Sequence, residues 1–205
     1  DPVASDSFGY SSSISGDTIV VGAYLEDSSS SGVINGTGGP AGSGASASGA
    51  AYVYRRTGVT WVQEAALKAA DPVAGDVFGY SSSISGDTIV VGAYTEDSST
   101  SGVINGTGGP SGAGASGSGA AYVYRRTGVT WVQEAALKAA DPENSNYFGV
   151  SSSISGDTIV VGASNEESSA SGVINGTGGP SGTGASASGA AYVYRRTGVT
   201  WVQEA

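Results

Sequence analysis

Pairs of adjacent carboxylates recur in this sequence and are its first candidates for chemistry. They stand as Glu26-Asp27, Glu96-Asp97 and Glu166-Glu167, each shortly after a run of β-branched residues. Calcium prefers oxygen ligands and takes about six to eight of them. Two interpretations stay open: a calcium or other divalent-cation site completed by Asp6, Asp76 and nearby carbonyls, or a solvated acidic rim that resists aggregation. The irregular ligand spacing favours the rim.

A second recurring motif is Asn-Gly-Thr, which matches the acceptor for N-glycosylation. It begins at Asn35, Asn105 and Asn175, each inside a long Gly/Ser-rich segment. Such a triplet marks an exposed loop in a secreted protein, but Asn-Gly also forms turns. The sequence therefore predicts either a modified asparagine or a turn at these three places, and favours the turn.

The composition argues against catalysis and against several kinds of partner. The 205 residues include no histidine and no cysteine, so the serines lack their usual base and there is no thiol nucleophile. The adjacent acids point apart along a strand, which is poor geometry for glycoside hydrolysis. The net charge of −10 disfavours nucleic acid, and no run is long enough for a membrane-spanning helix. We expect no enzyme, no nucleic-acid partner and no membrane insertion.

The elements that must position these residues repeat three times. Asp-Pro opens copies at residues 1, 71 and 141, and the first two copies differ at only seven positions. This predicts three units, 1–70, 71–140 and a slightly truncated 141–205, with any site present three times.

Each copy favours four strands and no helix. In the first copy, residues 8–15 and 18–23 flank a Gly16-Asp17 turn, and residues 49–56 and 61–68 flank a Thr57-Gly58 turn. Residues 24–48 show no period and are predicted to be a long loop. Asp17, Asp87 and Asp157 are expected to be turn residues. Tandem units of four short antiparallel strands are typical of the blades of a β-propeller, an all-β fold.

Alternation along the last two strands predicts one ion pair per copy. It places Val53, Arg55, Val62 and Glu64 on one face of the hairpin. Arg55 is therefore expected to pair with Glu64 across the strands, with Arg56 facing solvent.

The ordered set Phe8-Gly9-Tyr10-Ser11, residues 15–23 and residues 49–54 resembles the FG-GAP repeat of integrin α-subunits and secreted bacterial proteins. The resemblance implies a four-stranded blade, an extracellular or cell-surface location, and an adhesive role with glycans or surface proteins as partners. Integrin-type blades hold calcium in a hairpin loop. Here that hairpin shrinks to Ser15-Gly16-Asp17, which has too few oxygens, so the family's calcium site is not carried over.

Three blades are fewer than the smallest closed propeller, so two blade faces should be left open. We expect a homo-oligomer, either two chains in a six-bladed ring or a longer array or filament. The expected function is a non-catalytic extracellular structural or adhesive scaffold that self-assembles through these faces. The alternative is a lectin-like or cation-binding propeller with one site per blade.

Overall fold

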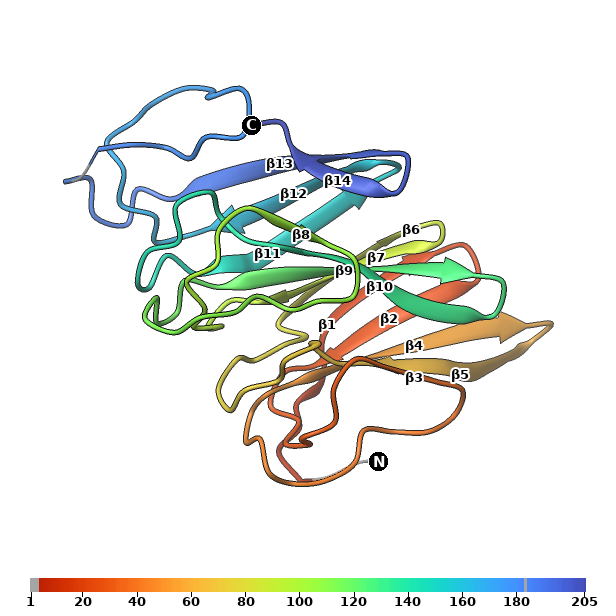
Figure 1. Ribbon diagram of the computed structural model, residues 1–205. Coiled ribbons are helices and arrows are strands. Elements are labelled where there is room, and N and C mark those ends of the chain that lie inside the picture. The colour runs from red at the N-terminus through yellow and green to blue at the C-terminus, as the bar shows by residue number, and fades with distance from the viewer. Residues whose placement is uncertain (1–3, 183) are drawn as a thin grey trace.

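The structure is a computed structural model that describes residues 4–182 and 184–205, and it consists of three antiparallel sheets in chain order (Figure 1). The first sheet has the order β1-β2-β4-β5-β3, the second β6-β7-β9-β10-β8, and the third β11-β12-β13-β14. The strands are β1 (Phe8–Ser15), β2 (Thr18–Ala23), β3 (Val33–Asn35), β4 (Ala50–Thr57), β5 (Thr60–Leu67), β6 (Ser81–Ser85), β7 (Thr88–Ala93), β8 (Val103–Asn105), β9 (Ala120–Thr127), β10 (Thr130–Leu137), β11 (Phe148–Ser155), β12 (Thr158–Ala163), β13 (Ala190–Thr197) and β14 (Thr200–Gln203). The all-β fold with four-stranded antiparallel blades is confirmed.

Local sequence explains the four main strands of each blade. β2 is a run of β-branched residues that ends on Gly22-Ala23, and it is paired antiparallel on both sides, with β1 and β4. Gly16 takes φ of +56° in the tight turn between Ser15 and Thr18, a conformation that favours glycine. The part of the chain that the structure describes contains no helix long and apolar enough to cross a membrane.

The long loop was wrongly predicted to be without structure. Val33–Asn35 forms β3, which pairs with the end of β5 through Val33↔Leu67 and makes a fifth, edge strand. Three residues are too few for alternation to appear in a sequence. The same residues of the third copy, 173–175, form no strand, and the neighbouring β14 ends at Gln203.

The core lies between successive sheets. Phe78, Tyr124 and Trp131 of the second blade are buried together with Val53 and Leu67 of the first. The sheets approach so closely that a Cβ on Gly22 would overlap the carbonyl oxygen of Gly79. Figure 1 shows the long loops at one end of the three sheets and the tight hairpins at the other.

Candidate functional site

The first acid of each pair lies inside a blade. Glu26 is buried, and its Oε2 lies 2.6 Å from Nζ of Lys68, which is fully buried. Lys68 also donates to Oγ of Ser48 and to the carbonyl of Ser28. Burial lowers the pKa of Lys68, and Glu26 counters part of that shift. The second blade repeats the pair with Lys138 and Glu96, 2.5 Å apart.

The third blade keeps the acid and has no counterpart of the lysine. Glu166 is buried and accepts hydrogen bonds from the amide and the hydroxyl of Ser168, at 2.9 and 2.7 Å. The last residue, Ala205, corresponds to Ala65, three positions before Lys68. The position that corresponds to Lys68 thus lies beyond the given sequence.

The second acids lie in the loops. Asp27 accepts from the amide of Ala47 and Asp97 from that of Gly117, both at 2.8 Å, whereas Glu167 is exposed. Asp76 accepts from the amide of Val73. Among the described residues, no group of three or more acids is placed to hold a metal ion. Calcium binding by these acids stays a prediction.

The asparagines of the Asn-Gly-Thr triplets form contacts between blades. The side chain of Asn35 accepts from the amide of Trp131 at 2.7 Å and donates to its carbonyl at 3.1 Å. Asn105 makes the same two bonds with Trp201. The side chain of Asn175 is exposed on the outer face of the third blade. Glycosylation of Asn35, Asn105 and Asn175 stays a prediction, and it would compete with the contacts of the first two.

The expected pair between Arg55 and Glu64 is wrong. Register places Val53 opposite Ala65 and Tyr54 opposite Gln63, so Glu64 is the extra residue of a β-bulge that breaks the alternation. Arg55 donates to Oγ1 of Thr18 instead.

Glu64 reaches across to the next blade. Its carboxylate accepts two hydrogen bonds from Nε and one, at 2.6 Å, from Nη2 of Arg126, and one from the indole of Trp131 at 2.9 Å. Burial would raise the pKa of Glu64, but the bonds from Arg126 and Trp131 outweigh it and leave the pKa below its usual value. Glu134 binds Arg196 and Trp201 in the same way.

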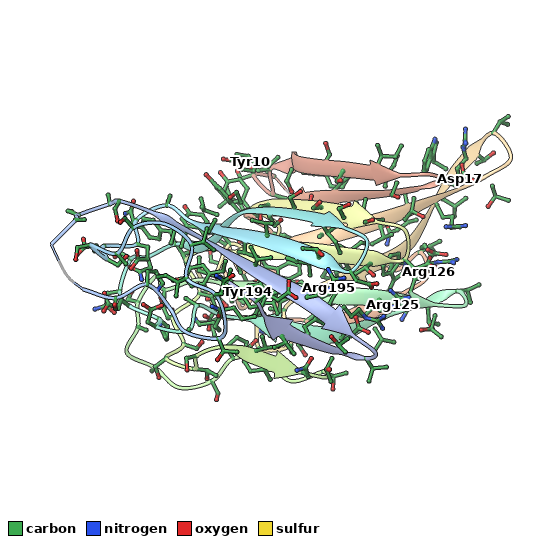
Figure 2. All side chains as sticks on the ribbon, turned by 90° about the horizontal axis from the view of Figure 1, so that it is seen from above. Tyr10, Asp17, Arg125, Arg126, Tyr194 and Arg195 are labelled. Atoms are coloured by element: carbon green, nitrogen blue, oxygen red, sulfur yellow. The ribbon has the colours of Figure 1, made fainter. Side chains whose placement is uncertain are left out.

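At the ends of the chain the same residues find other partners. Arg56 of the first blade binds the carboxylate of Asp17, and Nε of Arg195 in the third blade lies 3.8 Å from Glu204. Figure 2 shows Asp17 and the arginines Arg125, Arg126 and Arg195 at the hairpin end of the sheets, away from the long loops. Arg195 and Glu204 are the counterparts of Arg55 and Glu64. Among the described residues, the ion pair that alternation predicts is therefore present only in the third blade, where both side chains are half-exposed.

Backbone and hydroxyl contacts complete each interface between blades. Ser11 donates to the carbonyl of Gly79 at 2.8 Å, and Ser13 and Ser15 accept from the amides of Ile84 and Gly86. The second interface repeats these bonds one copy later. Ser81 donates to the carbonyl of Gly149, and Ser83 and Ser85 accept from the amides of Ile154 and Gly156.

A row of tyrosines runs across the blades. Ring centroids of successive members lie between 4.4 and 5.5 Å apart, through Tyr10, Tyr24, Tyr80, Tyr94 and Tyr147. Next to it, Tyr147, Asp97, Thr95 and Ser116 line a shallow polar pocket of about 290 Å³. No motif predicts this pocket, because its wall comes from two blades.

The chain matches the model of the FG-GAP repeat three times, over residues 1–54, 61–124 and 131–194. No curated protein matches it. The matched segments contain the Phe-Gly pairs at Phe8, Phe78 and Phe148, and two of those phenylalanines are buried against the preceding blade. The chain belongs to the FG-GAP repeat family, and its sheets are consecutive blades of an open β-propeller.

Proposed function

We propose that the protein is a non-catalytic, extracellular structural scaffold whose chains join end to end through their open blade faces. One observation carries the proposal: each end of the chain exposes half of an interface that the chain uses twice inside. Phe8 and Ile14 of the first blade are 55% and 62% exposed, whereas Phe78 and Ile84 of the second are 0% and 6% exposed. Apolar patches of this kind mark interaction sites.

The two free faces carry complementary halves of the same contacts. The last blade presents Asn175, Glu204 and Ser151, the counterparts of the residues that bind the following blade. The first blade presents Trp61 and Arg56, both exposed, which are the residues that receive them. A second copy of the chain thus offers Trp61 to Asn175 and Arg56 to Glu204, in the geometry of the inner interfaces.

A contact of this kind joins unlike faces, so it generates a ring if the rotation closes and a filament if it does not. Two chains supply six blades, which lies within the range of closed propellers. The family supports an extracellular location, since FG-GAP repeats occur mainly in extracellular proteins. An adhesive role rests on the same family analogy.

Light scattering behind a size-exclusion column, at several protein concentrations with and without calcium, tests the proposal. We expect a two-chain or larger species. The variant Gly162→Ala should be monomeric, because the Cβ would meet the backbone of the docking blade as it would at Gly22 and Gly92. Within the chain that Cβ meets only the Ser151 side chain, which can rotate away.

The matched control is Gly178→Ala, a substitution in the same blade with open space around it. Its counterpart Gly38 faces Ile34 of its own blade, so this variant should assemble like the unsubstituted chain. A monomer at all concentrations, or assembly that survives Gly162→Ala, would refute end-to-end joining.

The alternative, a lectin-like or cation-binding propeller, is favoured by the polar pocket beside Tyr147. An aromatic wall with a carboxylate opposite suits a sugar ring, and Asp97 and Tyr147 supply both. Calorimetric titration with a glycan panel and with calcium tests it. Saturable binding heat that disappears in the Tyr147→Ala variant would support the lectin-like function. The absence of binding heat with both the glycans and calcium would refute this alternative.

A further inference from the structure

The tyrosine row places one tyrosine pair directly across the interface between the first two blades. Tyr10 and Tyr80 hold the same position in successive copies, and their ring centroids lie 4.8 Å apart with the ring planes tilted by 42°. Figure 2 shows Tyr10 at the opposite end of the first blade from Asp17. We propose that Tyr10 and Tyr80 form an oxidative cross-linking site, at which a haem peroxidase with hydrogen peroxide joins two blades through a carbon–carbon bond. Both residues belong to one chain, so the inference does not depend on whether chains associate.

The geometry favours this pair over its neighbours. Tyr24 lies 5.5 Å from Tyr80, but the two rings meet edge-on at 83°. Tyr10 and Tyr24 belong to one blade, as do Tyr80 and Tyr94, so neither of these pairs would join blades. A hydrogen bond between the phenol groups of Tyr10 and Tyr80 brings their oxygen-bearing ends together, and it raises the pKa of Tyr10. Tyrosyl radicals couple at the ring carbons next to the oxygen, so these two side chains present their reacting carbons to each other.

The composition directs an oxidant towards the tyrosine row. Oxidants attack cysteine and methionine in most proteins, and this sequence contains neither. The remaining oxidisable side chains are 11 tyrosines and 3 tryptophans, of which Trp131 and Trp201 are only 1% exposed. Tyr10 is 52% exposed, and Tyr80 and Tyr94 of the middle blade are also partly exposed. The row is therefore accessible from solvent within the chain as well as at its first blade.

The reaction is a coupling of two phenols with loss of two hydrogen atoms. The peroxidase takes one electron and one proton from each phenol, and hydrogen peroxide accepts them and becomes two molecules of water. The two radicals then form a bond between the ring carbons next to their oxygens. Each of these carbons passes its hydrogen to the phenol oxygen of its own ring, which restores both aromatic rings.

The product would fasten the first interface covalently. Tyr10 and Tyr80 are one full copy of the repeat apart, so the new bond closes a long loop in the unfolded chain. A cross-link of that kind restricts the unfolded state and stabilises the folded one. The two rings are already in contact in the folded chain, so the blades need little rearrangement to accept the bond.

The test oxidises the 205-residue chain at low concentration with a haem peroxidase and limiting hydrogen peroxide, and then digests it with trypsin. Trypsin cuts after lysine and arginine, which places Tyr10 in the peptide 1–55 and Tyr80 in the peptide 69–125. We expect these two peptides to be joined with the loss of two hydrogen atoms, and tandem mass spectrometry to assign the bond to Tyr10 and Tyr80. The midpoint of urea unfolding should rise in the cross-linked chain.

Three variants make the result specific. Tyr10→Phe keeps the ring and removes the phenol, so the yield of joined peptides should fall at least about tenfold and the urea midpoint should no longer rise on oxidation. Tyr54→Phe is the matched control, because Tyr54 is a half-buried tyrosine of the same peptide outside the row, and it should leave the yield unchanged. Tyr24→Phe should also keep the yield, which distinguishes Tyr10 from Tyr24 as the partner of Tyr80. Circular dichroism checks that each variant stays folded.

Several outcomes would overturn the inference. One is a yield of joined peptides that Tyr10→Phe does not lower. Another is a main product that links Tyr80 to Tyr94, or that links two copies of the chain. Oxidation confined to Trp61, which is 39% exposed, would overturn it as well, as would the absence of joined peptides.

Discussion

Trp131 and Trp61 occupy the same position in successive copies, yet 1% of the first and 39% of the second is exposed. Trp131 lies in an interface inside the chain, bonded to Asn35 and Glu64 of the blade before it. Trp61 lies on the outer face of the first blade. The local sequence around the two residues is the same, so the neighbouring blade alone makes the difference.

The arginines likewise differ in their partners according to the neighbouring blade. Arg126 lies 4.0 Å from Asp87, the aspartate in the turn of its own blade, but 2.6 Å from Glu64 of the preceding blade. Arg56 has no such acid within reach and stays with Asp17. A repeat of this kind is stabilised by terms within each blade and terms between neighbours, and only the second kind differs between the middle and the ends.

The largest effect should come from removing the buried tryptophan. Trp131→Ala deletes a fully packed side chain and leaves Glu64 without its indole donor, so it should lower the free energy of unfolding by about 3–5 kcal/mol. The matched Trp61→Ala should cost less than about 1 kcal/mol. Urea unfolding measures both. Similar losses for the two would show that the middle and the end do not differ in the way that their exposure indicates.

The buried ion pair gives the next comparison. Glu96→Gln leaves Lys138 buried without its counter-charge and should cost about 3 kcal/mol. Glu166→Gln strands no lysine and should change the free energy of unfolding by less than about 1 kcal/mol. Chemical denaturation again gives the values, and a loss at Glu166 as large as that at Glu96 would contradict the comparison.

A third pair concerns the close approach of the sheets. The Cβ introduced by Gly92→Ala would overlap the carbonyl of Gly149 in the next blade and should cost about 2 kcal/mol. Gly162→Ala faces no blade within the chain and should lie within about 0.5 kcal/mol of the unsubstituted protein. The comparison is made on thermal and urea unfolding below the concentration at which chains associate. Equal destabilisation would mean that Gly92 matters for its own strand and not for the neighbour.

A pH series separates the second blade from the third. Burial raises the pKa of Asp76 to about 7, and the third copy carries Asn146 at that position. An acid whose pKa is raised by folding binds its proton more tightly when folded, so its contribution is present below about pH 4 and is lost as pH rises through 7. Asp76→Asn should therefore gain stability relative to the parent between pH 4 and pH 7, by about 1.4 kcal/mol for each unit by which folding raises the pKa of Asp76.

The measurement is urea unfolding of both proteins at half-unit steps of pH. Part of the dependence should remain in the variant, because burial also raises the pKa of Asp71 to about 6. Parallel curves for the two proteins would show that Asp76 does not titrate in this range.

The smallest effect belongs to the asparagines. Asn105→Ala removes two hydrogen bonds to the backbone of Trp201 and should cost about 1 kcal/mol. Asn175→Ala removes neither bond and should be within about 0.5 kcal/mol of the parent. Thermal unfolding resolves this difference, and the reverse order of the two variants would exclude a role of Asn105 between blades.

The fold was largely predictable because its signals are local. The run Thr18–Ala23 and the turns at Gly16-Asp17 and Thr57-Gly58 define two hairpins by residue type alone. β3 escaped prediction because its three residues show no alternation, and its pairing partner Leu67 lies far along the chain.

The contacts of the candidate site were much less predictable. Glu64 was assigned a partner by alternation, and a bulge moved it to another blade. Glu26 and Lys68 are 42 positions apart, and Asn35 and Trp131 are 96 apart, which is more than the length of one copy. The contact of Asn35 with Trp131 follows from how the sheets stack, which no single copy of the repeat encodes.

The contacts between blades also govern how the chain would respond to pulling at its two ends. The hydrogen bonds that Ser11, Asn35 and Glu64 make with the next blade go no further than that blade, so tension does not have to break all interfaces together. A blade torn from one end leaves the remaining interface complete. Each released copy of 70 residues adds roughly 240 Å of extended chain. The molecule should lengthen in discrete steps, because one blade unfolds at a time and absorbs part of the applied work.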